Sequence, residues 1–215
     1  MSERPLVAVL DYGIGNLHSA HKAIEKMGAD ARLTADPALI ADADGVVLPG
    51  VGAFGACMST LRAVGLEESA LAAAASGRPF LGICVGMQML FDGSEEDPDA
   101  AGLGIVPGTV RWIPPGVKRP QMQWNRLVPR LADDPMLAEL GDDPWVYFVH
   151  SLHGVPNDPS VVAATCEYGT DLNAAFRLDN VFATQFHPEK SGPTGLRLLA
   201  NFVRVCAEAR DGVRA

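Results

Sequence analysis

The sequence predicts an α/β fold: an open, mostly parallel central sheet with helices on both faces and an added antiparallel strand region in the second half. In the first half, short apolar runs alternate with segments of helical periodicity, as in repeated strand–helix units. In the second half, strand-like runs follow one another with Pro, Gly and Asn/Asp turns between them. At 215 residues without a linker-like stretch, we predict one domain spanning residues 1–215.

The first half begins with a buried strand at Leu6–Leu10, followed by a turn over residues 11–15. A helix starts at Leu17, because apolar residues then recur at helical spacing until Gly28 offers a stop. The further elements expected are a weak strand at 31–34, a strong strand at 45–48, an alanine-rich helix at 61–76, a strand at 79–83, and a helix beginning with 86–91.

The second half contains strand-like runs separated by turn residues. These runs are residues 109–113, 145–150, 161–166, 174–178 and 181–186. The stretch "RLDN" between the last two is typical of a hairpin turn. Residues 194–210 close the chain as an amphipathic helix with one apolar side.

Composition excludes several classes of function. A formal net charge of −9 argues against nucleic-acid binding, which needs a basic face. No run is long and apolar enough for a signal peptide or a membrane span, so we predict a soluble cytoplasmic protein. The four cysteines show no pairing or spacing suited to zinc, and we expect neither a metal nor a cofactor. They are Cys57, Cys84, Cys166 and Cys206.

Cys84 stands in the pattern Gly82-Ile83-Cys84-Val85-Gly86, between a predicted strand and a predicted helix. This is the spacing of a nucleophile elbow, where flanking glycines allow a sharp turn and the side chain projects from the sheet edge. The following helix N-terminus favours a thiolate, and its free N–H groups can receive an oxyanion. The simpler alternative is a core cysteine beside two packing glycines.

A thiol nucleophile needs a base, and His187 is the best candidate because it follows the apolar run "VFATQF" and precedes "PEKSG". Carboxyl ends of parallel strands meet at the edge where α/β sheets assemble their sites. Pro188 restricts the step to Glu189, whose carboxylate can orient the imidazole. The pattern predicts a Cys84–His187–Glu189 relay. Taken alone, His187 could be a surface loop residue, and His18 and His21 on the first helix are expected to be solvated.

The loop "LPGVGAFG" after the strand at 45–48 is rich in glycine, so its amides can approach a ligand closely. It could supply a second oxyanion-hole N–H, from Val51 or Gly52, beside that of Val85. A plain strand-to-helix turn is the alternative.

The elbow, the "PGVG" loop and the "HPE" ending together resemble the class I, triad-type glutamine amidotransferase family across nearly the whole chain. Five stretches are more narrowly similar to the subfamily of glutaminase subunits of imidazole glycerol phosphate synthase. They are "VLDYGIGNLHSA", "PGVGAFG", "GICVGMQMLF", "YFVHS" and "QFHPEKSG".

The resemblance implies glutamine hydrolysis through a cysteinyl thioester, with Cys84 as nucleophile, His187 as acid and base, and Glu189 orienting the imidazole. It assigns the oxyanion hole to amides of Val85 and the Val51–Gly52 loop. Four further positions match substrate contacts: Gln88, Glu96, Ser151 and Leu152. From spacing alone, Gln88 could be a solvated helix residue and Glu96 a loop charge.

The resemblance also implies a partner, a (β/α)8-barrel cyclase subunit that forms a heterodimer with this chain and receives the ammonia. Positions that match the interface are Tyr12, Asn16, Trp124, Asn125, Tyr147 and Lys190. Trp124 lies in the stretch "QMQWN", which we expect to be a polar loop, where a large aromatic indicates an anchor; a core tryptophan is the alternative. Lys190 could be an ordinary surface charge.

This sequence departs from the family pattern at Gln121 and Gln123, where the family usually has histidine and glycine, and at Leu152, where an aromatic is common. These departures leave two alternatives open: a tuned partner interface, or a paralogue that serves another synthase. Two other classes of function are alternatives: a cysteine hydrolase of related fold, which the "HPE" ending disfavours, and an inactive scaffold, which the intact Cys84, His187 and Glu189 disfavour.

Overall fold

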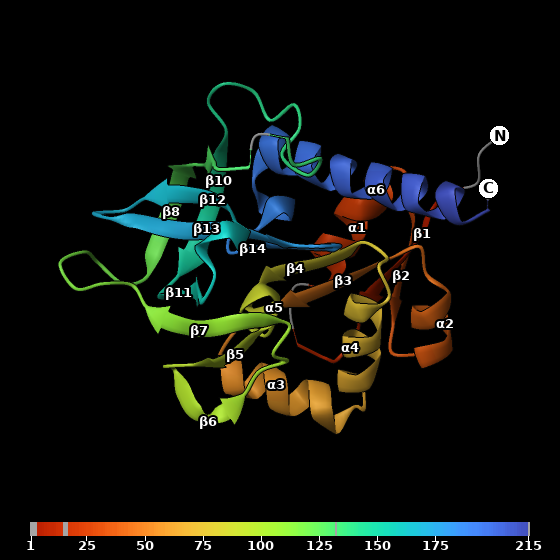
Figure 1. The fold of residues 1–215 in the computed structure, drawn as a ribbon, viewed down its shortest axis with the longest axis horizontal. Coiled ribbons are helices and arrows are strands. Elements are labelled where there is room, and N and C mark those ends of the chain that lie inside the picture. Colours follow the sequence, from red (N-terminus) through yellow and green to blue (C-terminus); the bar gives the residue numbers. More distant parts are fainter. Residues whose placement is uncertain (1–3, 15–16, 132, 215) are drawn as a thin grey trace.

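The computed structural model describes residues 4–14, 17–131 and 133–214, and an eight-stranded sheet forms its centre (Figure 1). The strand order is β2-β1-β3-β4-β14-β13-β12-β9. Its bounds are β1 Leu6–Leu10, β2 Asp30–Thr34, β3 Gly45–Gly50, β4 Phe80–Cys84, β9 Val128–Pro129, β12 Val162–Glu167, β13 Asp171–Leu178 and β14 Val181–Thr184. Strands β2, β1, β3, β4 and β14 pair in parallel, and the remaining three add antiparallel pairs. The predicted fold class is confirmed.

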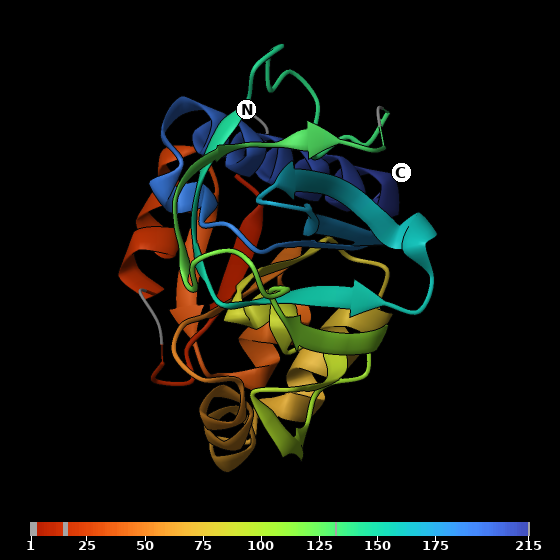
Figure 2. The same cartoon turned by 90° about the vertical axis from the view of Figure 1, so that its left-hand side faces the viewer.

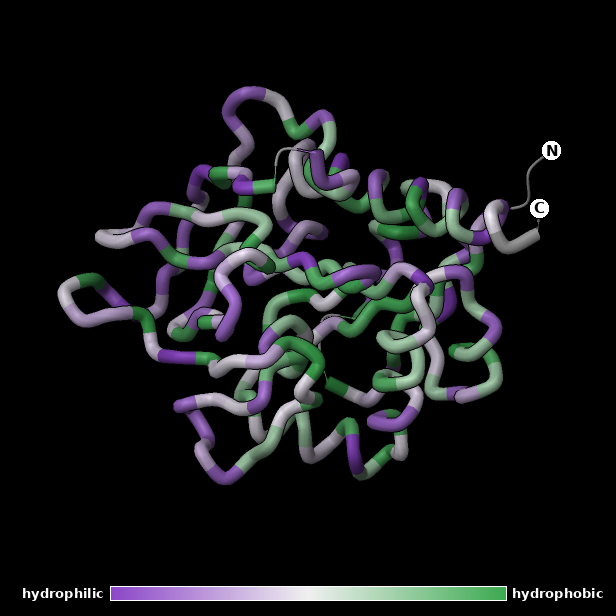
Figure 3. Tube along the Cα trace, in the orientation of Figure 1, coloured by the Kyte–Doolittle hydropathy of each residue, from purple (hydrophilic) through white to green (hydrophobic). Residues whose placement is uncertain are grey.

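Helices cover both faces of this sheet, which explains why β3, β4 and β14 are buried along their whole length (Figures 1 and 3). Helices α1 and α6 lie on one face, and α3 and α4 on the other. The helix bounds are α1 Leu17–Lys26, α2 Pro37–Asp42, α3 Phe54–Ala63, α4 Glu67–Ala75, α5 Val85–Gln88 and α6 Gly192–Arg214. Within the described residues, no helix has both the length and the apolar character needed to cross a bilayer.

Two smaller sheets stand beside the carboxyl end of β4 (Figure 2). One has the order β11-β7-β5-β6, and the other pairs β10 with β8. Their bounds are β5 Phe91–Ser94, β6 Asp97–Ala101, β7 Val106–Trp112, β8 Gln121–Arg126, β10 Trp145–His150 and β11 Leu152–Pro156. These sheets bring the chain after Glu95 and around Ser151 back towards Cys84, so they supply walls for a site.

Three predicted elements are corrected. The single helix expected at 61–76 is two helices, α3 and α4, because Gly65 takes φ +74° between them. The helix expected over 86–91 ends at Gln88, and Phe91 begins strand β5. A short apolar run is compatible with either a helix or a strand, so the sequence alone does not decide between them. The stretch "QMQWN" is strand β8, whose partner β10 lies 19 to 29 residues further along.

Elements absent from the prediction are short or at sheet edges. Helix α2 has six residues, and Asp36 caps it by accepting a 2.9 Å hydrogen bond from the Ala38 N–H. Strand β6 reads "DPDAA", which has almost no strand propensity, and pairing with β5 holds it extended. The predicted hairpin between β13 and β14 is confirmed, with Asp179 at φ +49° in the turn.

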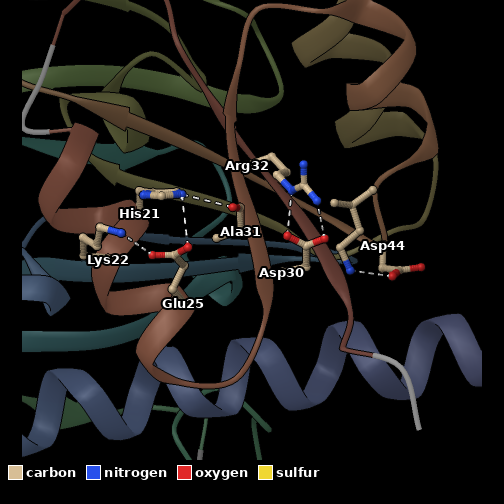
Figure 4. Close-up of polar contacts among 8 residues, drawn as sticks. His21, Lys22, Glu25, Asp30, Ala31, Arg32 and Asp44 are labelled. Atoms are coloured by element: carbon tan, nitrogen blue, oxygen red, sulfur yellow. Dashed lines mark hydrogen bonds and ion pairs between the residues drawn. The ribbon is translucent and has the colours of Figure 1, made fainter.

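Charged residues gather on α1 and β2 near the amino ends of the parallel strands, with ion pairs within each element, and His21 links the two elements (Figure 4). The expectation that His21 is solvated is wrong: its side chain is half-buried, and Nε2 lies 3.0 Å from the Ala31 carbonyl oxygen. Asp44 accepts a 2.8 Å hydrogen bond from the Leu6 N–H, fixing the start of β1 beside β3. This network therefore stabilises the end of the sheet opposite Cys84.

Candidate active site

Cys84 ends strand β4 and precedes α5, with φ 56° and ψ −115°, a backbone conformation that costs a non-glycine residue about 1–3 kcal/mol. The glycines around it are required by close packing. A Cβ on Gly86 would lie 1.9 Å from the Leu48 carbonyl oxygen, and one on Gly82 would lie 3.1 Å from the Met87 Cα. The predicted elbow geometry is thus present, and the cysteine is only 5% exposed.

His187 follows β14, which pairs with β4, so the imidazole and the thiol lie at the same sheet edge. Nδ1 of His187 lies 2.8 Å from Glu189 Oε1, and both side chains are almost fully buried. Burial lowers the pKa of His187, but interactions with Cys84 and Glu189 outweigh it and raise the pKa above its ordinary value. Because Nδ1 of His187 is hydrogen-bonded to Glu189, the other ring nitrogen, Nε2, is available to interact with the Cys84 sulfur. The structure therefore brings together the three residues predicted to form the relay.

The turn that carries this histidine is fixed by strand β10. Ser191 is buried; its hydroxyl donates to the His187 carbonyl at 2.6 Å and accepts from the Tyr147 N–H at 2.9 Å. The His187 N–H in turn donates to the Tyr147 carbonyl at 3.2 Å. Residues 188–190 form a single 3₁₀ turn that folds Glu189 back onto the imidazole.

A cavity of about 350 Å³ opens in front of Cys84 and His187. Its walls contain all the residues predicted for the oxyanion hole and the substrate: Val51, Gly52, Val85, Gln88, Glu96, Ser151 and Leu152. A larger cavity of about 750 Å³ lies among the charged residues at the amino ends of the strands, but its lining contains no cysteine or histidine. The nucleophile and base identify the smaller cavity as the candidate active site.

Gln88 is 4% exposed and not a solvated helix residue. Its side-chain amide donates to Gln185 Oε1 at 3.1 Å, and Gln185 Nε2 lies 4.0 Å from Cys84 Sγ. Gln185 is not among the predicted site residues, although a polar residue at the end of a buried strand, two residues before His187, indicates a site. Glu96 is not a free loop charge, because Oε2 accepts a 2.8 Å hydrogen bond from the Phe54 N–H.

Trp124 and Tyr147 are cross-strand neighbours on β8 and β10, with ring centroids 6.1 Å apart. Trp124 is 47% exposed, which excludes the core alternative. Lys190 is exposed at the cavity, and Asn125 donates a 2.7 Å hydrogen bond to the Glu167 carbonyl. Asn16 lies outside the described residues.

The resemblance assigns Tyr12 to the partner interface. Its side chain is only 1% exposed, so the ring is covered by this chain and offers almost no surface to a partner. Its hydroxyl donates a 2.6 Å hydrogen bond to the Pro49 carbonyl oxygen. Burial is the largest cause that raises the pKa of Tyr12, so the phenol stays protonated and able to donate. Through this hydrogen bond, Tyr12 fixes the Pro49 end of the glycine-rich segment.

Of the departures from the family pattern, Leu152 lines the cavity, and Gln121 lies behind the wall, against His150. Gln121 is fully buried, and its amide oxygen lies 2.8 Å from His150 Nε2, while Nδ1 of that histidine lies 2.7 Å from the Leu152 carbonyl oxygen. Burial lowers the pKa of His150 to about 4, so the ring is neutral near pH 7. Gln121 therefore connects strand β8 to the wall formed by Leu152. Gln123 is exposed on the same strand.

The other three cysteines are buried and form no disulfide. Burial raises the pKa of Cys57 and Cys206, and that of Cys166 to about 12, so each is a neutral thiol near pH 7. In the part of the chain that the structure describes, no group of histidine, cysteine and acidic residues could hold a metal ion.

Comparison with known proteins places the chain in a family. The family model described as "Glutamine amidotransferase class-I" matches residues 8–206, so the chain belongs to the class-I glutamine amidotransferases, which are enzymes. Curated relatives of about 50% identity include imidazole glycerol phosphate synthase subunits HisH. That of Synechococcus elongatus is 51% identical over 213 residues, with 98% of each chain covered. That of Methanothermobacter thermautotrophicus is 49% identical over 200 residues, covering 93% of this chain and 98% of the relative. The subfamily predicted from the five motifs is confirmed.

Solved structures give the same fold at low sequence identity. A glutamine amidotransferase structure superposes with a TM-score of 0.73 at 21% identity, covering 93% of this chain and 98% of the other. A chain of PurLQS from Thermotoga maritima gives 0.71 at 20% identity, with 94% and 98% covered. At this identity the likeness supports the fold alone.

Proposed function

We propose that this chain hydrolyses glutamine to glutamate and ammonia, with Cys84 as nucleophile. The sulfur attacks the side-chain amide carbon, and the carbonyl electrons move to oxygen. When the carbonyl reforms, the C–N bond breaks and His187 protonates the departing ammonia, leaving a γ-glutamyl thioester. His187, having given its proton to the ammonia, then takes a proton from water as the water oxygen attacks the thioester carbon. When the carbonyl reforms, the C–S bond breaks, glutamate leaves, and the proton on His187 returns to the sulfur. The observation that carries this proposal is a strained, buried thiol beside an imidazole whose pKa is raised by that thiol and by Glu189.

The cavity walls supply the remaining roles. Amides of Val85 and of the Val51–Gly52 loop are proposed to stabilise the oxyanion of both tetrahedral intermediates, since both segments line the cavity beside Cys84. Glu96 is proposed to pair with the α-ammonium of glutamine. Gln88, Ser151 and Leu152 are proposed to hold the amino-acid end and the side chain of the substrate.

We further propose that the ammonia passes to a separate (β/α)8-barrel cyclase subunit within histidine biosynthesis; the HisH relatives are named as subunits of imidazole glycerol phosphate synthase, which implies a second subunit. Ammonia that escapes into neutral water becomes protonated and loses its nucleophilic lone pair, so a docked partner preserves its reactivity. The chain is proposed to act in the cytoplasm as one domain, residues 1–215. The test is to isolate the native partner and to assay formation of imidazole glycerol phosphate with glutamine as the only nitrogen source.

Changing Glu189 to glutamine is expected to shift the basic limb of the pH–kcat/KM profile to lower pH. Glu189 raises the pKa of His187, so the imidazolium persists to higher pH in the native enzyme; removing that charge lowers the pKa, and the acid form is lost sooner. The profile is measured by ammonia release in the presence of the partner. Glu68→Gln, on the exposed side of α4, is the control and is expected to leave the profile unchanged. A Glu189→Gln profile that superposes on the native one would refute the orienting role.

Changing Trp124 to alanine is expected to weaken partner binding about ten- to a hundredfold, as truncation of an exposed aromatic anchor does. At a saturating concentration of the partner, the rate of glutamine hydrolysis by the variant is expected to return to the native rate. Leu71→Ala, which removes an exposed apolar side chain from α4, is the control. Affinity is measured by titration calorimetry. Equal affinities for both variants and the native chain would show that β8 does not contact the partner.

A further inference from the structure

A single residue, Ser151, separates strand β10 from strand β11 at the wall of the candidate active site. Its carbonyl accepts a 2.9 Å hydrogen bond from the Ile113 N–H. The next carbonyl, that of Leu152, lies 2.7 Å from Nδ1 of His150, so the side chain that precedes this corner folds back onto it. The position of the wall therefore depends on how the His150 ring is held.

Gln121 holds this ring from its other side. It is the cross-strand neighbour of His150 in the β8–β10 pair, and both side chains are buried. One terminal atom of the amide, Oε1, lies 2.8 Å from His150 Nε2, and the other, Nε2, lies 3.9 Å from the Cys166 sulfur. His150, Ser151 and Leu152 line the cavity, and Gln121 lies one layer behind them. An effect of Gln121 on the cavity is therefore transmitted through the imidazole.

The number of protons on the ring decides which way the amide must face. Burial lowers the pKa of His150 to about 4, so near pH 7 the ring has one N–H for its two contacts. The Leu152 carbonyl can only accept, which places that proton on Nδ1 and leaves Nε2 as an acceptor. Nε2 then needs a donor, and the amide supplies one if rotation exchanges its oxygen and nitrogen, two atoms of nearly the same size. The oxygen then faces the Cys166 thiol, which keeps its proton because burial raises its pKa to about 12.

We propose that Gln121 is a positioning residue of the proposed glutaminase reaction: its amide N–H donates to His150 Nε2 and keeps the ring proton on Nδ1, where it holds the Leu152 carbonyl at the cavity wall. This inference rests on the proposed function. The wall surrounds glutamine equally before and during the chemical step, so the effect of Gln121 is expected in KM and not in kcat. Gln121 stands where the family usually has histidine, whose ring N–H can make the same donation.

The test compares Gln121→Met, Gln121→His and Gln123→Met in the full chain at a saturating concentration of the partner. Methionine keeps the length of the glutamine side chain but has no N–H, and Gln123 is the matched control because it is exposed on the same strand. Gln121→Met is expected to raise KM for glutamine about two- to tenfold with kcat unchanged, as loss of one ordinary hydrogen bond does. Gln121→His is expected to return KM towards the native value, and Gln123→Met to leave it unchanged. Equal KM values for Gln121→Met and Gln123→Met overturn the positioning role.

A second readout is independent of turnover. In chains labelled with ¹⁵N-histidine, the ring resonances of His150, identified by their loss in His150→Gln, are expected to show a proton on Nδ1 and none on Nε2 near pH 7. The Nε2 resonance is expected to shift in Gln121→Met and to stay unchanged in Gln123→Met. A native ring with its proton on Nε2, or an Nε2 resonance that does not move in Gln121→Met, overturns the proposal. If the native chain and its partner release no ammonia from glutamine, the proposed function fails, and the spectrum still decides whether Gln121 is the donor.

Discussion

Changing Cys84 to alanine is expected to abolish glutamine hydrolysis, lowering kcat by a factor on the order of 10⁴ or more. The reason is chemical: no other thiol lines the cavity, and no thioester can form without the sulfur. Cyclase activity of the complex with added ammonium salt is expected to survive, because only the ammonia source is removed. Ammonia release and product formation are measured on the same preparation.

Two variants make this result specific. Cys206→Ala removes a buried thiol far from the cavity and is expected to keep full activity. Cys84→Gly is expected to be as inactive as Cys84→Ala but more stable towards urea by about 1 kcal/mol, since glycine adopts the φ of 56° without strain. Glutamine turnover by either Cys84 variant would show that the nucleophile lies elsewhere.

Changing His187 to alanine is expected to lower kcat for glutamine hydrolysis about 10²- to 10⁴-fold. The imidazole is the group placed to protonate the departing ammonia, and it also stabilises the sulfur anion through the interaction that raises its own pKa. The variant is also expected to react more slowly with iodoacetamide at pH 7, because it lacks the imidazole that can take up the thiol proton when the sulfur attacks.

His18→Ala is the matched control, since it deletes an exposed imidazole from α1. Both the hydrolysis rate and the alkylation rate of this control are expected to equal the native values. A His187→Ala enzyme that retains native alkylation and turnover would mean that His187 and Cys84 do not interact in solution, whatever their positions in the fold.

The central site could be predicted from sequence because local patterns determine it. The glycines around Cys84 reflect close backbone contacts with Leu48 and Met87, so their spacing identifies the elbow directly. His187 and Glu189 are two residues apart, and Pro188 limits how the turn between them can fold. That Cys84 and His187 lie close together then follows from one rule: parallel strands present their carboxyl ends at the same edge of the sheet.

The supporting contacts depend on long-range pairing that no local pattern contains. Gln185 reaches Cys84 because β14 pairs with β4 in one register, although about a hundred residues separate the two strands in the chain. Ser191 fixes the turn at His187 by accepting a hydrogen bond from the Tyr147 N–H on β10, a residue 44 positions away in the chain. Strand β8 could not be predicted because its polar sequence favours a loop, and pairing with β10 overrides that preference.

The measurement that tests the account most directly is trapping of the covalent intermediate. The native chain and its partner are mixed with glutamine, quenched in acid within one turnover, digested and analysed by mass spectrometry. We predict a γ-glutamyl group on the peptide that contains Cys84, accumulating before glutamate and absent in Cys84→Ala. Steady glutamate production with Cys84 unmodified throughout, or with the adduct on Cys57, Cys166 or Cys206, would contradict it.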